Sequence, residues 1–109
     1  MNLVEFIETG IFARQIDSCL SPDEYQRFQA ELMADPEKGV IIPGSGGLRK
    51  IRVGCKSRGK RGGVRVIYYL ITKKNVILLL FAYPKNIQDN LSNSQLQALR
   101  RVAEEVEDG

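Results

Sequence analysis

The sequence predicts an α+β domain whose helices pack on one face of a mostly antiparallel sheet, leaving the other face for a ligand. The predicted elements follow in the order strand, two helices, three strands and a final helix. Residues 64–72 and 75–83 are rich in valine, isoleucine, leucine and tyrosine, which indicates an antiparallel hairpin at the centre of the sheet. The length of 109 residues suits one hydrophobic core, so we expect a single domain over residues 1–109.

The N-terminal third predicts a short strand over residues 3–7 and then two helices that form a hairpin. Apolar residues at helical spacing favour the first helix: Ile11, Phe12, Ile16 and Cys19. The second helix begins with Ser21-Pro22-Asp23-Glu24, a capping box with serine as N-cap and a glutamate three residues later. Asp35-Pro36 ends this helix. Its apolar stripe consists of Tyr25, Phe28, Leu32 and Met33.

The remaining elements are marked by glycine, proline and serine. Residues 39–47 are predicted to be a loop, and residues 48–53 a strand on which Lys50 and Arg52 share one face. Residues 55–63 form a basic, glycine-rich connection to the hairpin. Ser92 or Ser94 caps the final helix. One face of that helix carries Leu96, Leu99, Ala103 and Val106.

Charge is distributed unevenly along the chain. All 13 acidic residues lie outside residues 38–88, whereas 12 of the 16 basic residues lie inside that stretch. The central half of the chain is therefore strongly cationic and should attract a polyphosphate ligand. RNA or DNA is the ligand that fits this charge best. This distribution is more informative than the net charge of +3.

Several classes of protein are disfavoured. No apolar run reaches the roughly 18 residues that span a bilayer. The N-terminus carries two acids and no basic start, so we expect no secretory signal and a cytoplasmic protein. Cys19 and Cys55 have no metal or redox spacing, the chain lacks histidine, and we expect neither a metal nor a cofactor. The glycines of residues 44–47 are not followed by the lysine of a phosphate loop, which favours a plain turn.

Arg65 lies within the first strand of the predicted hairpin, on the same face as Ile67 and Tyr69. An arginine beside core residues is costly unless an anion binds it. The alternative is an arginine at the rim of the sheet, whose extended stem covers apolar neighbours.

Four segments together resemble the RelE/HigB toxin superfamily, and within it HigB-like toxins of type II toxin-antitoxin systems. These segments are Gly47–Val53, Lys60–Gly63, Val64–Tyr69 and Tyr83–Asn86. The resemblance covers nearly the whole chain, and it implies a RelE-like fold with an N-terminal helical hairpin and a C-terminal helix. It further implies a ribosome-dependent mRNA endonuclease that cleaves in the A site without a metal, through attack of the ribose 2′-hydroxyl. Its partners would be a cognate antitoxin, the 70S ribosome and mRNA.

The resemblance also suggests site residues. The strand arginine of the family matches Arg65, two lysines of the preceding strand align with Lys50 and Arg52, and a lysine after the last strand aligns with Lys85. This chain departs from the family at Asn86, where many members carry arginine, and at Leu91 or Ser92, where they carry tyrosine. With Tyr83 added, the candidate catalytic set is Arg65, Lys50, Arg52, Lys85, Tyr83 and Asn86.

Transesterification needs stabilisation of the charged phosphorane, a base for the 2′-hydroxyl and an acid for the leaving oxygen. Arginine binds phosphate but does not carry protons. The proton carriers left in the basic region are Lys50, Lys56, Lys60, Lys85 and Tyr83, and the sequence does not choose among them. Tyr83 has two further interpretations, as a stacking partner for a base or as a core tyrosine. The set predicted to bind RNA or ribosome phosphates is Arg49, Lys56, Arg58, Lys60 and Arg61.

Two non-enzyme functions are alternatives: a non-catalytic RNA- or ribosome-binding module, and an antitoxin-like DNA-binding regulator. The regulator is disfavoured because the basic residues lie on strands and a loop rather than on a recognition helix. An antitoxin would cover either the basic residues or the helices of residues 10–35. Apolar Tyr25, Phe28 and Leu32 favour the helices as its docking surface.

Overall fold

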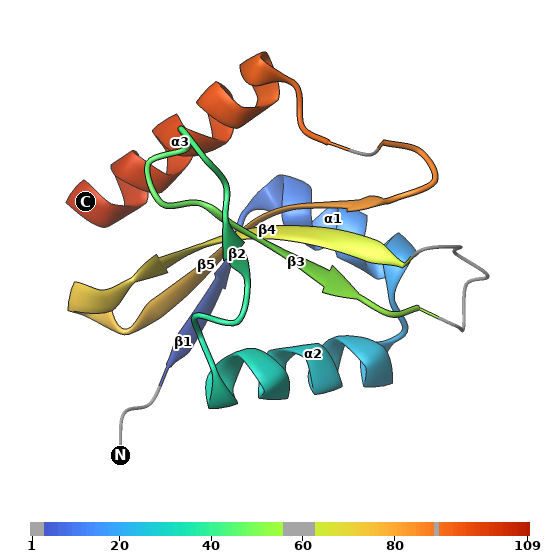
Figure 1. The fold of residues 1–109 in the computed structure, drawn as a ribbon. Helices are drawn as coiled ribbons and strands as arrows, with labels where there is room; N and C mark the ends of the chain where they lie inside the picture. Colours follow the sequence, from blue (N-terminus) through green and yellow to red (C-terminus); the bar gives the residue numbers. More distant parts are fainter. Residues whose placement is uncertain (1–3, 56–62, 89) are drawn as a thin grey trace.

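The protein is a sheet with helices on both faces (Figure 1). The structure is a computed structural model that describes residues 4–55, 63–88 and 90–109. Within these residues five strands form one sheet in the order β1-β5-β4-β3-β2. Their bounds are β1 Glu5–Glu8, β2 Val40–Ile41, β3 Arg49–Val53, β4 Val64–Ile71 and β5 Val76–Pro84. The β1–β5 pair is parallel and the other pairs are antiparallel, so the predicted mostly antiparallel sheet is confirmed.

One face of the sheet is covered by the N-terminal helices α1 (Gly10–Cys19) and α2 (Pro22–Ala34). They follow each other directly and form the expected helical hairpin (Figure 1). The predicted capping box of α2 is confirmed: Ser21 Oγ accepts from the Glu24 N–H at 3.2 Å, and Glu24 Oε1 accepts from the Ser21 N–H at 2.9 Å. Phe12 and Phe28 are buried against the side of β4 that carries Val64, Val66 and Tyr68.

The opposite face is covered by α3 (Asn93–Asp108), which corrects the expectation that every helix packs on one side. Ile67 and Ile71 of β4 are fully buried beneath it. The physical reason is that β4 is apolar on both faces, and a strand of this kind needs cover on both. Of the two proposed caps, Ser92 is the one used, with Gln95 completing a capping box. In the described part of the chain, no helix has the length and apolar character needed to cross a membrane.

Two further details differ from the sequence prediction. Residues 39–47 were expected to be a loop, yet Val40 and Ile41 pair with Lys50 and Arg49 as β2. In the central hairpin, Ile67 lies opposite Phe81 while Tyr68 lies opposite Leu79, so Leu80 is an additional residue in β5. This bulge shifts the alternation of β5 and sets which of its side chains reach each face.

Tyr68 connects the sheet to the segment that follows α2. Its side chain is fully buried, and its hydroxyl accepts from the Gly39 N–H and donates to the Pro36 carbonyl, both at 2.8 Å. Burial raises the pKa of Tyr68. A Cβ on Gly39 would lie 2.7 Å from the tyrosine ring, so only glycine fits there. These contacts hold β2 beside β3.

We predict that Tyr68→Phe lowers the free energy of unfolding by about 2 kcal/mol, because it leaves a buried N–H and a carbonyl without their partner. Tyr69→Phe is the matched control. The Tyr69 hydroxyl donates to the partly exposed Glu107 at 2.8 Å, and water can replace this bond in the variant. We therefore expect its free energy of unfolding to fall by less than about 1 kcal/mol. Urea unfolding of both variants measures the difference, and equal losses would contradict the role given to Tyr68.

Candidate nucleic-acid interface

Two arginines lie directly opposite each other on neighbouring strands. The sheet register pairs Arg52 of β3 with Arg65 of β4, and Arg65 with Tyr83 of β5. Directly opposed residues point to the same face of a sheet. Ile51 and Val53 pack with the α1–α2 cluster, so the row of Arg52, Arg65 and Tyr83 belongs to the α3 side.

Lysines extend this row in both directions. Lys50 lies two residues before Arg52 and opposite Ile67, so it shares their face, as the sequence predicts. Beyond the last strand pair, the Lys85 N–H donates to the Gly63 carbonyl at 3.2 Å and continues the pairing of β4 with β5. Lys50, Arg52, Arg65 and Lys85 are hereafter called the cationic face.

The cationic face lies beside the part of the sheet that α3 covers. Figure 1 shows α3 over the end of β4 where the strand finishes, whereas the connection from β5 to α3 passes the end where it begins. Arg52 and Lys85 are exposed, and Arg65 and Lys50 are half-buried. Like charges opposed across two strands repel each other. An anion bound between them relieves this repulsion, so the arrangement suits a phosphate ligand.

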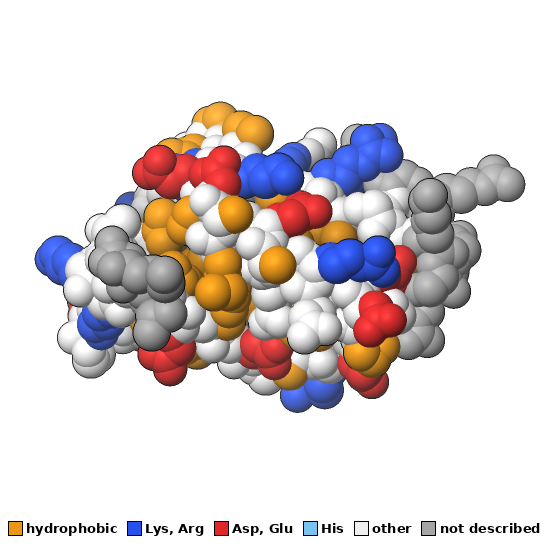
Figure 2. All heavy atoms as spheres, turned by 90° about the horizontal axis from the view of Figure 1, so that it is seen from below, with side chains coloured by type: hydrophobic (Ala, Val, Ile, Leu, Met, Phe, Trp, Pro, Cys, Tyr) orange, Lys and Arg blue, Asp and Glu red, His pale blue; other side chains and the backbone are white. Residues whose placement is uncertain are grey.

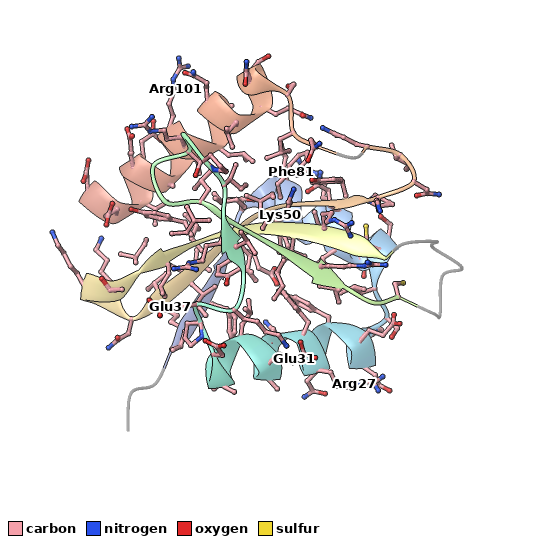
Figure 3. All side chains as sticks on the ribbon, viewed as in Figure 1. Arg27, Glu31, Glu37, Lys50, Phe81 and Arg101 are labelled. Atoms are coloured by element: carbon pink, nitrogen blue, oxygen red, sulfur yellow. The ribbon has the colours of Figure 1, made fainter. Side chains whose placement is uncertain are left out.

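The two aromatic residues of this face differ in accessibility. Tyr83 is only 4% exposed, which favours the core interpretation of its ring over stacking on a base. Phe81 is half-buried, and the centroid of its ring lies 6.0 Å from that of Tyr83. Ile67 pairs with Lys50 on one side and with Phe81 on the other, so these three residues lie side by side across the sheet. Figure 3 shows Lys50 and Phe81 on the same side of the sheet, and Arg27 and Glu31 beyond the other. No pattern in the sequence indicates the face of Phe81, because the bulge at Leu80 shifts the alternation of β5.

Arg49, one of the residues predicted to bind RNA or ribosome phosphates, does not lie on the cationic face. It lies opposite Tyr68, on the α1–α2 side of the sheet. Its guanidinium donates to the carbonyls of Gly39 at 2.7 Å and Glu37 at 3.1 Å, and its side chain is 17% exposed. These bonds give Arg49 a structural role beside Tyr68.

Some of the other predicted site residues lie outside the described part of the chain, and others lie near the cationic face. Lys56, Arg58, Lys60 and Arg61 lie outside the described residues. Asn86 is exposed in the turn after Lys85, next to the cationic face. Lys50 also has a contact that the sequence did not indicate: its ammonium donates to Asn90 Oδ1 at 3.2 Å, across 40 residues of chain.

A hollow of about 720 Å³ lies between α2 and the edge of β3, and Arg52 is the one residue of the cationic face in its lining. Its lining includes Asp23, Glu24 and Glu31, which repel phosphate. Figure 2 looks onto this side and shows acidic and basic side chains interspersed. An anionic ligand is therefore better matched by the cationic face than by this groove.

A family model described as the RelE toxin of the RelE/RelB toxin-antitoxin system matches residues 12–108. The chain belongs to the RelE toxin family. It is accordingly a toxin of a toxin-antitoxin system, and its partner is an antitoxin.

Solved structures of a RelE toxin share this fold. A double arginine-to-alanine mutant of E. coli toxin RelE in the free state is 14% identical with a TM-score of 0.58, over 81% of this chain and 90% of that one. The isolated E. coli RelE toxin is 16% identical with a TM-score of 0.57, over 92% and 99%. The predicted RelE-like architecture is confirmed.

The apolar residues of α2 that were expected to attract the antitoxin are largely buried. Phe28 and Leu32 are buried, at 2% and 0% exposure. Tyr25 is half-buried and its hydroxyl donates to Glu8, and this burial and bond raise the pKa of Tyr25. Within the described part of the chain, the exposed large apolar residues are instead Ile11, Met33, Val40, Ile41 and Ile87. Tyr25, Phe28 and Leu32 therefore do not support the helical hairpin as the docking surface.

Gly63 sets the close approach of β3 and β4 beside the arginine pair. Its φ is +76°, and a Cβ there would lie 2.4 Å from the Val53 carbonyl oxygen. We predict that Gly63→Ala lowers the free energy of unfolding by about 2 kcal/mol or more. The control is Gly54→Ala, whose Cβ would meet nothing within 4 Å and should change stability by less than about 0.5 kcal/mol. Similar urea midpoints for the two variants would contradict this account of the register.

Proposed function

We propose that this toxin is a ribosome-dependent endoribonuclease of the HigB-like kind, which cleaves translated mRNA in the ribosomal A site. The proposed reaction is metal-independent: the ribose 2′-hydroxyl attacks the adjacent phosphate, and the bond to the 5′-oxygen of the next nucleotide breaks. A 2′,3′-cyclic phosphate and a free 5′-hydroxyl result. The observation that carries the proposal is the opposed pair of Arg52 and Arg65.

The chemistry of the cationic face agrees with this reaction. Negative charge accumulates on the phosphate oxygens as the phosphorane forms, and fixed guanidinium groups stabilise that charge more than the charge of the ground state. Arg65 in the central strand is the best-supported clamp, because a neighbour on each side holds it in register. Arg52 is placed to bind a second oxygen of the same group.

Proton transfer falls to groups around the two arginines. Since an arginine keeps its proton, Lys50 and Lys85 are the described cations that could donate to the leaving oxygen. Because RNA carries its own nucleophile, the protein needs to supply only charge stabilisation and proton transfer. We propose that the arginines stabilise the charge, while one lysine accepts the proton of the 2′-hydroxyl and another donates a proton to the leaving 5′-oxygen.

An open cationic surface also suits a substrate held by a larger particle. The groups that position mRNA would come from the ribosome, while the toxin brings the reactive groups to one phosphate. The basic residues at 56–61 follow β3 in the sequence and are proposed to bind ribosomal RNA phosphates.

The first functional prediction concerns Arg65→Ala, which should slow mRNA cleavage by about 100-fold or more because a fixed transition-state donor is lost. Arg27→Ala removes the same group from the exposed side of α2 and should cleave normally. Primer extension in a translating extract maps the new mRNA ends for each variant. Wild-type protein that binds ribosomes without producing new ends would instead indicate a non-catalytic RNA- or ribosome-binding module.

The second concerns ribosome binding. Replacing Lys56, Arg58, Lys60 and Arg61 with alanine should weaken association and flatten its salt dependence, by up to about 0.7 to 0.9 units of slope per lost phosphate contact. A charge-matched control replaces Arg14, Arg27, Lys38 and Arg101, which all lie elsewhere on the surface. Sedimentation with ribosomes over a range of salt concentrations gives both slopes. If the control flattens the slope more, the ribosome binds another surface.

A further inference from the structure

Lys50 reaches across the fold to the connection between β5 and α3. Its Nζ donates to Asn90 Oδ1 at 3.2 Å, and Asn90 is the one hydrogen-bond acceptor of this ammonium within the described residues. None of the ion pairs found in those residues includes Lys50. The ammonium group is thus held by a neutral amide.

Asn90 is itself fixed by the N-terminal cap of α3. Gln88 Nε2 donates to the Asn90 carbonyl at 2.8 Å and to Gln95 Oε1 at 2.6 Å. Gln95 Oε1 also accepts from the Ser92 N–H at 2.9 Å, as part of the capping box. The adjoining Leu91 and Leu96 pack on the α3-side core. The amide that holds Lys50 is therefore anchored to a packed helix.

A neutral acceptor has a different effect from a carboxylate. An amide oxygen takes one of the three N–H groups of the ammonium and leaves its charge undiminished. A carboxylate would fix the position equally well but would compete with the phosphate for the positive charge. A long lysine side chain loses much rotamer freedom when it is held, so holding it in advance lowers the cost of reaching the substrate.

We propose that Asn90 is a positioning residue that holds the Lys50 ammonium over the cationic face while leaving its charge for the RNA phosphate. This inference rests on the proposed endonuclease function. It assigns a role to a residue that touches the reacting atoms only through Lys50.

The experiment measures single-turnover mRNA cleavage on programmed ribosomes, as a function of toxin concentration and pH. Asn90→Ala should reduce the maximal rate on the order of tenfold, with the half-saturating toxin concentration changed by less than about twofold. In a Lys50→Ala background the same change should add nothing, because the group that Asn90 positions is already gone. Asn93→Ala, which removes an exposed amide from the first residue of α3, should behave as wild type.

Asn90→Asp separates positioning from folding, because the side chain keeps its size and gains a negative charge. A carboxylate beside the ammonium favours the protonated lysine, so the limb of the pH profile that reports this lysine should move to higher pH. The direction is the same whether the reaction needs the charged or the neutral form. Circular dichroism melting of each variant shows whether α3 remains folded.

The possible outcomes separate the positioning role of Asn90 from the proposed endonuclease function. If wild type cleaves and Lys50→Ala is impaired, but the effects of Lys50→Ala and Asn90→Ala multiply, the positioning role is overturned alone. An Asn90→Asp profile with wild-type midpoints would also overturn it. A wild-type protein that does not cleave, or a fully active Lys50→Ala variant, would overturn the assigned function of the cationic face together with the inference.

Discussion

The register of β4 between β3 and β5 is the constraint on which both layers of the protein depend. Val66 and Tyr68 are buried beneath α1 and α2, while Ile67 and Ile71 are buried beneath α3. A slip of one residue would exchange these two sets and move Arg65 to the helical-hairpin side. Two-sided burial therefore fixes the face on which the arginine lies. The glycine at position 63 lies at one end of this register, and the bulge at Leu80 lies within it.

That constraint also brings cationic side chains of two strands together in a protein that has no histidine. The sheet brings Arg52 and Arg65 into direct opposition and so concentrates positive charge at one place on its surface. Close to this pair, Asn90 holds the Lys50 ammonium through a neutral amide. One end of β4 thus contributes to the cationic face, while the rest of the strand is buried in the core on both sides.

Local signals predicted the elements well, whereas long-range contacts decided their placement. The capping boxes at Ser21 and Ser92 involve residues three apart, so the sequence shows them directly. α3 covers its side of the sheet because β4 is buried on both faces. The nearly continuous apolar run of β4 agrees with this burial, but it does not say which helix covers which face. Alternation correctly placed Lys50 and Arg52 together, but it did not reveal that Arg49 bonds the carbonyls of Glu37 and Gly39. The Lys50–Asn90 contact spans the whole central hairpin and leaves no local pattern in the sequence.

The central claim is that the cationic face stabilises attack by the RNA's own 2′-hydroxyl. It is tested most directly with ribosomes programmed with mRNA that carries a single 2′-deoxy nucleotide on the 5′ side of the scissile phosphate. Cleavage of the unmodified mRNA should leave a 2′,3′-cyclic phosphate, proceed in excess chelator as far as the ribosomes remain intact, and stop at the deoxy position. Cleavage of the deoxy-substituted mRNA at the same phosphate and at the same rate would contradict the account, because the nucleophile would then have to come from elsewhere.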